Sequence, residues 1–511
     1  MSTFSFLLSR IATIGTLIFC SVLSMSQQIS QQAPPQSGSP SEDLTQAIRE
    51  LRDQVRELRG SVDDLRGECR HYREEAEELR RELGIPKPSE GQAVDALQSQ
   101  SSDQRLSKLE EDVQLLDVKV DEQHQSKVES ASKYRVRLSG IVLFNLFGNR
   151  GNVDNIDNPN FALSPASDGS LGSFGGTLRQ SLLGLELFGP RLAGAKTSAA
   201  VQFDFAGGFS PTSNGVSFGL ARLRTGVIRA DWTDTSVVAG QDSLFFAPNL
   251  PTSFASLSAP ALAYSGSLWA WTPQIRIEHR FELSDKSGVS VTAGILDPLS
   301  GEPPSSDYLR QAGTGEQAGQ PAYATHFAFT RKTDGRSLKL GAGAYYSRQN
   351  WGFDRRIDAW AAVADWEVPL GRLFQFAGEL YRGSAIGGIG GASGQSVLFS
   401  GSPSASETYV HGLNDAGGWA QLKFSPTARI EFNGAFGQDN PYANDVRYFP
   451  SSDQGYFNPL LVRNRGEFVN TIFRPRSDLV LALEYHRLRT FELPRASFTA
   501  NHIDLGLGML F

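Results

Sequence analysis

Cysteine is scarce in this 511-residue chain, which has only 2 cysteines, Cys20 and Cys69. Cys20 lies in an N-terminal segment that we expect to be removed, so one cysteine would remain and an internal disulfide framework is excluded. The chain also lacks CxxC, HExxH, P-loop and GxSxG motifs, and its 7 histidines are scattered. We therefore expect no catalytic residue, no metal site and no cofactor, and predict that the protein is not an enzyme.

Long hydrophobic runs are also missing, because no segment reaches the roughly 18 consecutive apolar residues of a membrane-spanning helix. The longest apolar run, residues 11–23, follows Arg10 and precedes small and polar residues. This order predicts a secretory signal peptide over residues 1–26. A single membrane anchor is the alternative, but the run is short for one. A lipoprotein signal at Cys20 is disfavoured by the bulky Phe19 before it.

Excess charge of one sign is absent as well. The net charge is −7, and from Tyr134 onward 32 Lys and Arg balance 32 Asp and Glu. No basic run indicates nucleic-acid binding. The charge balance also means that net charge predicts no preference for ions of either sign.

A heptad repeat is the first clear pattern after a polar, proline-rich linker at residues 27–41. Over residues 42–84 apolar side chains recur at alternating spacings of four and three, at Leu44, Ile48, Leu51, Val55, Leu58, Val62, Leu65, Cys69, Tyr72, Ala76, Leu79 and Leu83. The pattern predicts a coiled coil. One amphipathic helix lying on a partner domain is the alternative, for which this stripe is narrow. Within the seam, Cys69 is most simply a small buried apolar residue. The alternative is a disulfide between the two Cys69 side chains of a dimer, whereas a trimer would leave one of them over.

Helix-breaking residues then predict a hinge over residues 85–102, and a weaker heptad predicts a second coiled-coil segment over residues 103–130. The oligomeric state of this stalk stays open at the sequence level.

From residue 134 to 511 the apolar residues recur with period two, in stretches separated by turns rich in Gly, Asn, Asp, Pro and Ser. The stretches predict sixteen strands, an even number as a closed single-chain barrel requires, at 134–148, 176–189, 196–207, 215–232, 235–245, 268–282, 287–297, 321–332, 336–348, 356–369, 371–383, 416–425, 427–438, 462–474, 478–490 and 499–511. The fold class predicted is an all-β transmembrane barrel of about 16 antiparallel strands behind an α-helical coiled-coil stalk.

Three features favour a membrane barrel over a soluble β-sandwich. The polar positions of successive strands carry many charges, which a water-filled lumen accepts. Connections alternate between short ones, such as 190–194, and long ones, such as 383–415. Trp and Tyr gather near strand ends. We therefore expect an outer-membrane barrel in a bacterium of the Gram-negative type, with the stalk in the periplasm.

The last strand, HIDLGLGMLF, has one apolar face, which we expect to meet lipid, whereas His502 and Asp504 face the lumen. Its terminal Phe511 resembles the signal that outer-membrane assembly machinery reads. The candidate pore-lining residues are Arg222, Arg224, Arg276, Glu278, Arg280 and Lys339. Our hypothesis is a basic ladder that draws anions toward a constriction, and the alternative is an ordinary lumen wall in which carboxylates balance the arginines. Sequence does not indicate which long loop narrows the pore.

Several stretches resemble DcaP-type trimeric porins, namely AGQDSLFFAP at 239–248, TPQIRIEHRF at 272–281, GGWAQLKF at 417–424 and VNTIFRPRSDLVLALEYHRLRTF at 469–491. The resemblance implies a homotrimer in outer-membrane lipid that takes up small carboxylates and similar anions. The stalk is long and broken by prolines, which departs from the family.

The sequence therefore predicts an outer-membrane porin for passive diffusion of small hydrophilic solutes, with anionic solutes favoured. The alternative is a structural envelope protein whose stalk tethers the envelope or binds a periplasmic partner. An outer-membrane hydrolase lacks a local signature. A trimeric autotransporter would contribute only a few strands per chain, against the sixteen predicted here.

Overall fold

The computed structural model describes residues 134–511, apart from residues 166, 168, 209–218, 302–309, 334–335, 450–460 and 494–495. The signal peptide, the linker, both coiled-coil segments, the hinge and Cys69 lie outside the described residues. Within the described part, no helix is both long and apolar enough to cross a membrane.

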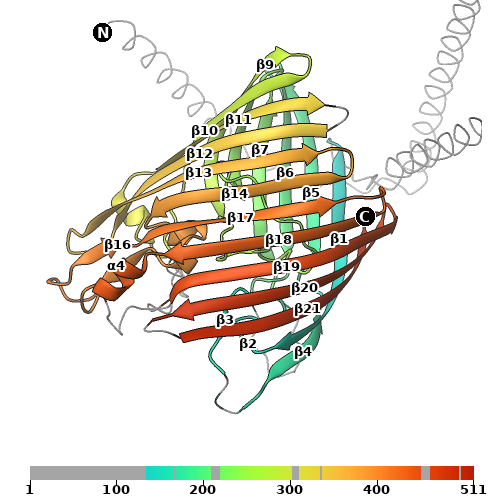
Figure 1. Cartoon of the computed structure of the whole chain (residues 1–511). Coiled ribbons are helices and arrows are strands. Elements are labelled where there is room, and N and C mark those ends of the chain that lie inside the picture. The colour runs from blue at the N-terminus through green and yellow to red at the C-terminus, as the bar shows by residue number, and fades with distance from the viewer. Residues whose placement is uncertain are drawn as a thin grey trace, which may run out of the picture. The chain divides into compact units, whose positions relative to one another are not determined.

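A closed antiparallel β-barrel makes up the described residues (Figure 1). Its strands are β1 (Val136–Arg150), β4 (Gly172–Thr177), β5 (Leu182–Leu192), β6 (Ala195–Asp204), β7 (Arg222–Asp231), β8 (Thr235–Ser243), β9 (Trp271–Ser284), β10 (Ser287–Leu296), β11 (Ala322–Thr333), β12 (Arg336–Asn350), β13 (Arg356–Leu370), β14 (Phe374–Ser384), β17 (Asn414–Phe424), β18 (Ile430–Pro441), β19 (Leu461–Arg476), β20 (Leu479–Glu492) and β21 (Ala496–Leu510).

Strand β1 closes the barrel by pairing with the last strand, β21, in a register that places Ile141 opposite Leu510 and Arg150 opposite Asn501. Along its other edge β1 pairs with β4 over one half and with β5 over the other half. The sheet of 17 strands therefore has sixteen positions, because β4 and β5 share one. The predicted closed barrel of sixteen strands is confirmed.

The second predicted strand, 176–189, differs from the structure in being interrupted. The chain leaves the sheet between Thr177 and Leu182, where Gln180 turns inward and is fully buried. The side-chain NH₂ group of Gln180 donates to the Ala255 carbonyl oxygen. The side-chain oxygen of Gln180 accepts a hydrogen bond from the Leu257 backbone N–H. These polar contacts take the place of hydrogen bonds between strands. The alternation of apolar residues in the sequence does not predict such a break. The predicted strand 215–232 begins later in the structure, at Arg222, and residues 215–218 of that prediction lie outside the described residues. The ends of the other predicted strands shift by at most three residues.

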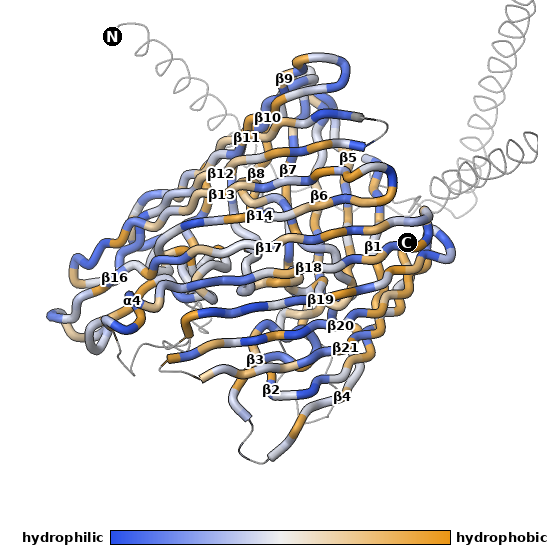
Figure 2. Tube along the Cα trace, viewed as in Figure 1, coloured by the Kyte–Doolittle hydropathy of each residue, from blue (hydrophilic) through white to orange (hydrophobic). Residues whose placement is uncertain are grey.

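Exposure alternates clearly along strands such as β1, β13, β20 and β21, so that one set of side chains points outward and the other into the barrel. On β21, Ile503 is 54% and Met509 is 56% exposed, whereas His502 and Asp504 are each 1% exposed. The predicted outward and inward faces of this strand are confirmed. The strands alternate between hydrophobic and hydrophilic residues, as Figure 2 shows.

Connections at the two ends of the barrel differ in length. At one end, here named the turn end, neighbouring strands are joined by short segments such as 193–194 and 477–478. At the other, the loop end, the long connections include L1 (151–171), L3 (244–270) and L6 (385–413). The long loops carry β2 (Asn152–Val153), β3 (Ala162–Leu163), η1 (Glu316–Ala318), η2 (Gly387–Ile389), η3 (Ala392–Gly394), β15 (Val397–Phe399), β16 (Val410–Gly412) and α4 (Ala443–Tyr448).

Candidate functional site: the lumen of the barrel

Loop L3 folds into the barrel and touches its inner wall on many strands. The Thr252 backbone N–H donates to the Gln421 side chain on β17 over 2.7 Å. The Asn145 side chain on β1 donates to the Phe254 carbonyl oxygen over 3.1 Å. L3 therefore spans the lumen between distant parts of the wall and narrows the interior.

Glycines on the wall let the L3 backbone approach closely. A Cβ atom added at Gly437 of β18 would lie 2.2 Å from the Ser265 carbonyl oxygen, which no real structure tolerates. Gly266 has a φ of +104°, and a Cβ there would lie 2.1 Å from the Gly418 carbonyl oxygen of β17. On β19 the Asn464 side chain donates to the Ser265 hydroxyl over 2.9 Å. L3 is thus fitted to this wall by close packing and by hydrogen bonds.

Acidic side chains on β13 to β21 are buried where L3 and L6 cover them. Glu484 accepts a hydrogen bond from the Ser253 hydroxyl over 2.6 Å, and Asp504 accepts one from the Asn145 amide over 2.8 Å. Glu379 accepts one from the Leu268 backbone N–H over 3.4 Å. These three carboxyl groups are at most 2% exposed. L3 contacts Glu484 and Glu379 directly, and it contacts Asn145, the partner of Asp504, through the Phe254 carbonyl oxygen. The three charges are therefore removed from the solvent-facing surface of the lumen.

Loop L6 covers two further acids through the short helix η3. The Ala392 backbone N–H donates to Asp415 over 2.6 Å, and the Ser393 hydroxyl donates to Asp439 over 2.8 Å. Tyr381 donates its hydroxyl to the same Asp439. Both aspartates are fully buried. The acidic half of the wall is therefore held under two inward-folded loops.

Loop L1 lies against L3 near the break in the second strand. The Asn158 amide donates to the Ser258 hydroxyl over 2.9 Å, and Asp157 forms an ion pair with Arg179 at 2.9 Å. Within L1, burial raises the pKa of Asp154, although its carboxylate accepts the backbone N–H groups of Asn160 and Phe161. L1 and L3 thus support one another at the loop end.

The candidates Arg222 and Arg224 lie together on β7, beside the buried Asp204 of β6. Arg222 forms an ion pair with Asp204 at 2.6 Å, and Arg224 lies 3.8 Å from the same carboxylate. Arg224 also donates to the Leu257 carbonyl oxygen of L3 over 2.7 Å. Both guanidinium groups stack over the ring of Trp271, at 5.0 and 4.7 Å from its centre. Two positive charges therefore share one carboxylate at the edge of L3.

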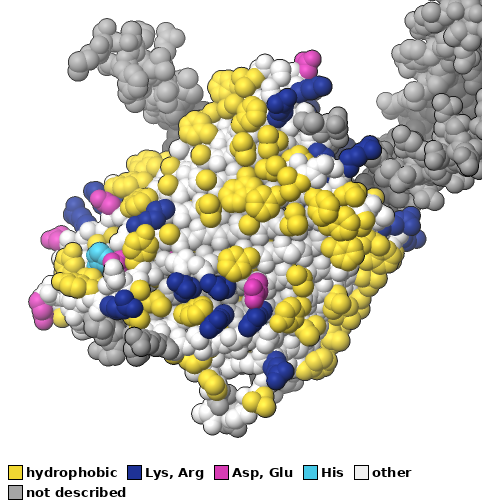
Figure 3. Space-filling model, viewed as in Figure 1, with side chains coloured by type: hydrophobic (Ala, Val, Ile, Leu, Met, Phe, Trp, Pro, Cys, Tyr) yellow, Lys and Arg dark blue, Asp and Glu magenta, His cyan; other side chains and the backbone are white. Residues whose placement is uncertain are grey.

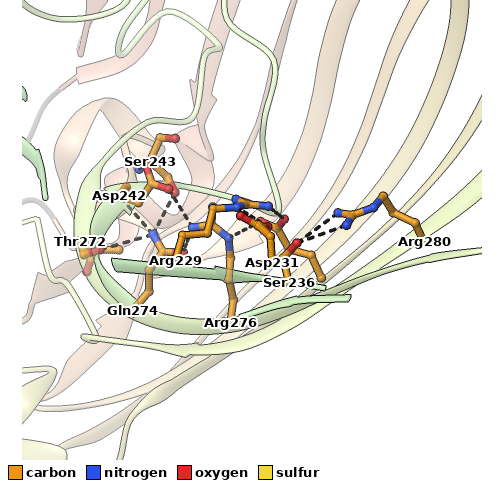
Figure 4. A network of polar contacts seen from close by, with 10 residues as sticks. Arg229, Asp231, Ser236, Asp242, Ser243, Thr272, Gln274, Arg276 and Arg280 are labelled. Atoms are coloured by element: carbon orange, nitrogen blue, oxygen red, sulfur yellow. Dashed lines mark hydrogen bonds and ion pairs between the residues drawn. The ribbon is translucent and has the colours of Figure 1, made fainter. Parts of the chain in front are cut away.

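The candidates Arg276, Glu278 and Arg280 share the inner face of β9. Arg276 and Arg280 belong to the polar network drawn in Figure 4. Arg276 pairs with Asp242 and with Glu278, each at 2.9 Å. Glu278 also pairs with Arg229 at 2.7 Å, and Arg229 with Asp231 at 2.7 Å. Arg280 donates to the buried Ser236 hydroxyl over 3.3 Å. The network contains as many arginines as carboxylates, which matches the balanced lumen wall more closely than an uncompensated ladder.

Lys339 lies on β12 near the turn end, apart from the other candidates, and pairs with Glu367 of β13 at 2.9 Å. Its side chain is 48% exposed. The structure therefore brings Arg222 and Arg224 together, places Arg276, Glu278 and Arg280 on the neighbouring part of the wall, and leaves Lys339 by itself.

Sequence reasoning missed the role of L3 and the carboxylate of Asp204. One signal was present: no charged residue occurs between Asp242 and Arg276, and the segment is rich in Ser, Ala and Pro. A water-exposed loop seldom lacks charge over such a length, so this composition suits a loop that is buried inside the barrel. Among the described residues, no group of three or more His, Cys, Asp or Glu could hold a metal ion.

The chain was compared with family models, curated sequences and solved structures. No protein-family model matches the chain, and no curated protein sequence matches it. The outer membrane channel DcaP of Acinetobacter baumannii is similar in structure, with a TM-score of 0.55 and 16% identity over 76% of this chain and 100% of that chain. An anion-selective porin from Comamonas acidovorans covers 74% of this chain and 100% of its own, with a TM-score of 0.45 and 10% identity.

OprB of Pseudomonas putida covers 74% of this chain and 94% of its own, with a TM-score of 0.45 and 12% identity. At these identities a structural likeness speaks of fold alone. The predicted resemblance to DcaP-type channels is confirmed at that level: the described residues have the fold of the outer-membrane channel DcaP.

Proposed function

We propose that this protein is a passive channel for small hydrophilic solutes in an outer membrane. One observation carries the proposal: a closed sixteen-stranded barrel has an outward apolar face and an inner wall lined by charged residues. Charged side chains are costly to bury in a packed protein core even when they are paired, because both partners lose their hydration. A membrane barrel accounts for both faces, because the apolar outer face meets lipid and the charged inner wall lines a water-filled passage narrowed by L3.

Solvent-accessible charge indicates where solutes pass. The acids Glu379, Asp415, Asp439, Glu484 and Asp504 are buried. By contrast, the side chains of Arg222, Arg229 and Glu278 keep 30%, 31% and 19% exposure. The proposed route therefore runs along β7, β8 and β9, with Lys339 and Glu367 near its turn end. Size is limited by L3, and electrostatic preference is set by the side chains of β7 and β9.

An anion preference is the finer part of the proposal. Arg222 and Arg224 share the single carboxylate of Asp204 at the edge of L3, so this point carries one positive charge in excess. The buried acids opposite are covered by protein. A small carboxylate would meet guanidinium groups, which are well suited to bind it. We propose that such anions pass more readily than cations of equal size.

The resemblance of stretches such as 239–248 and 469–491 to DcaP-type trimeric porins supports an assembly of three copies. In this proposal the loop end faces outside the cell and the residues before β1 lie in the periplasm. The heptad repeat over residues 42–84 supports a second role, a stalk that tethers the envelope or binds a periplasmic partner. Deleting residues 41–130 separates the two roles: envelope defects with solute uptake intact would support the tether, and lost uptake with a sound envelope would count against it.

Liposome swelling tests the channel directly. Full-length protein reconstituted into liposomes should admit small uncharged sugars, and the swelling rate should fall steeply as sugar size increases. Small dicarboxylates should enter faster than diamines of similar size. Folded, inserted protein that admits no solute would contradict the channel.

A further inference from the structure

Four arginines interrupt the apolar outer face of the barrel near the loop end. Arg463 and Arg465 of β19, with Arg487 and Arg489 of β20, alternate with buried residues and therefore point away from the lumen. Figure 3 shows basic side chains gathered around an acidic one over this part of the barrel. These four residues are here named the outer arginine cluster.

Three members of the cluster surround one aromatic ring. The guanidinium carbons of Arg463, Arg465 and Arg489 lie 5.4, 5.9 and 4.7 Å from the centre of the Phe491 ring. Arg465 and Arg489 are directly opposite across the two strands. Like charges in this position repel, and the repulsion is stronger beside a low-dielectric membrane. The arrangement favours an anion between the arginines.

Acidic side chains of the protein neutralise only a small part of the positive charge of the cluster. Glu467 lies 3.6 Å from Arg487. Arg463 and Arg465 donate instead to the neutral side-chain oxygens of Asn440 and Gln438, each over 3.0 Å. In the part of the chain that the structure describes, neither they nor Arg489 form an ion pair. Each guanidinium has five N–H donors, so donors remain for an external ligand.

An apolar groove of about 560 Å³ lies on the same outer face. It is lined by Phe376, Leu422, Phe436, Val469 and Tyr485, and Glu467 and Arg487 of the charged region lie along it. A second groove of about 550 Å³ shares Leu422, Val469 and Tyr485 with the first. The two grooves together provide an apolar path that begins at the cluster. A ligand that fits both features has an anionic headgroup and long hydrocarbon chains.

We propose that the outer arginine cluster and the adjoining grooves bind a phosphate-bearing lipid of the leaflet nearest the long loops. Guanidinium groups of Arg463, Arg465 and Arg489 hold the phosphate oxygens, for which their planar fork of donors is well suited. The acyl chains lie along the wall in the grooves. This inference rests on the proposed membrane location of the barrel, and it does not depend on the solute that the lumen conducts.

Another pair of arginines on the outer face provides a matched control. Arg348 of β12 pairs with Asp358 at 2.8 Å, and Arg356 lies close by on the partner strand β13, where Asn350 is its register partner. The variant R348Q/R356Q removes the same charge from the same face as R465Q/R489Q, but away from the grooves.

Native mass spectrometry of the full-length protein in detergent, titrated with bisphosphorylated lipid A, tests the site. Wild-type protein and R348Q/R356Q should retain the lipid equally, and R465Q/R489Q should bind it at least about tenfold more weakly, since two charged donors are lost. A dephosphorylated form of the same lipid should bind wild type as weakly as the phosphorylated lipid binds R465Q/R489Q. Equal retention by R465Q/R489Q and wild type would overturn the proposal.

Inorganic phosphate separates a lipid site from a site for a small anion. If millimolar phosphate leaves lipid retention unchanged, the headgroup and chains act together as proposed. If phosphate displaces the lipid completely at the concentrations at which it occupies the cluster alone, the lipid site is refuted. Channel currents of R465Q/R489Q should equal those of wild type, so that failure of this site and failure of the channel are told apart.

Discussion

Ser253 of L3 donates its hydroxyl hydrogen to Glu484 of β20 over 2.6 Å, across 231 residues of sequence. Glu484 also accepts from the Asn470 amide over 2.9 Å. This buried carboxylate joins the loop that narrows the lumen to the wall opposite its entry point. The path left for solutes depends on such attachments.

Replacing Glu484 with alanine should release this part of L3. The buried donors of Ser253 and Asn470 then lack their acceptor, which lowers the free energy of unfolding by about 1–3 kcal/mol. We expect noisier channel currents of larger mean size in single-channel recordings. Glu484→Gln keeps one acceptor oxygen and should restore most of the wild-type behaviour. Currents of Glu484→Ala that equal the wild type in size and noise would show that L3 is held without this contact.

Replacing Gly437 with valine should push L3 off the wall, because the Ser265 carbonyl oxygen occupies the space of a Cβ atom. Overpacking of this kind costs about 1–3 kcal/mol, so the thermal unfolding midpoint should fall. Gly434→Val on the same strand is the control, since a Cβ there meets only a Val469 methyl carbon at 3.9 Å. An equal change in midpoint for the two variants would argue against the close fit of L3.

Neutralising Arg222 and Arg224 together should reduce the anion preference. The double variant R222Q/R224Q leaves the buried Asp204 charge uncompensated and turns one excess positive charge into one excess negative charge. In a salt gradient the reversal potential should shift toward cation selectivity. The outward-facing variant R348Q/R356Q should leave it unchanged. An unaltered reversal potential in R222Q/R224Q would show that Arg222 and Arg224 do not determine the ion selectivity.

Phe511 is proposed as an assembly signal, although it also closes the barrel. Its backbone exchanges two hydrogen bonds with Gly140 of β1, at 2.9 and 3.1 Å. Deleting Phe511 should strongly reduce the amount of barrel in the outer membrane of cells, while purified protein should still fold in detergent. Met509→Ala, which removes an outward-facing apolar side chain, serves as the control. Equal loss of folding in detergent and in cells would point to barrel closure instead.

Strand number and the direction of side chains could be predicted from sequence because both follow from local alternation. Ile503 and Asp504 have opposite environments for the simple reason that they are neighbours on a strand. The break at Gln180 was not predictable in this way, because its cause is a set of hydrogen bonds to residues about 75 positions later, in L3. Long-range polar contacts leave no periodic trace.

In the candidate site, too, local alternation predicts the direction of a side chain but not its partner on another strand. Alternation placed Arg276, Glu278 and Arg280 on one face of a strand, and the structure does so as well. Alternation could not assign Asp204 to Arg222, or Asp242 to Arg276, since these pairs depend on register between strands. The stalk of residues 42–130 and the candidate roles of these side chains stay predictions.

Single-channel recording of the full-length protein in a planar bilayer tests the central claim most directly. A water-filled passage beside L3 predicts stepwise currents, in groups of three if the assembly has three copies, and candidate carboxylates should block them. A correctly folded and inserted barrel that carries no current would contradict the channel, and would leave the stalk as the functional part of the protein.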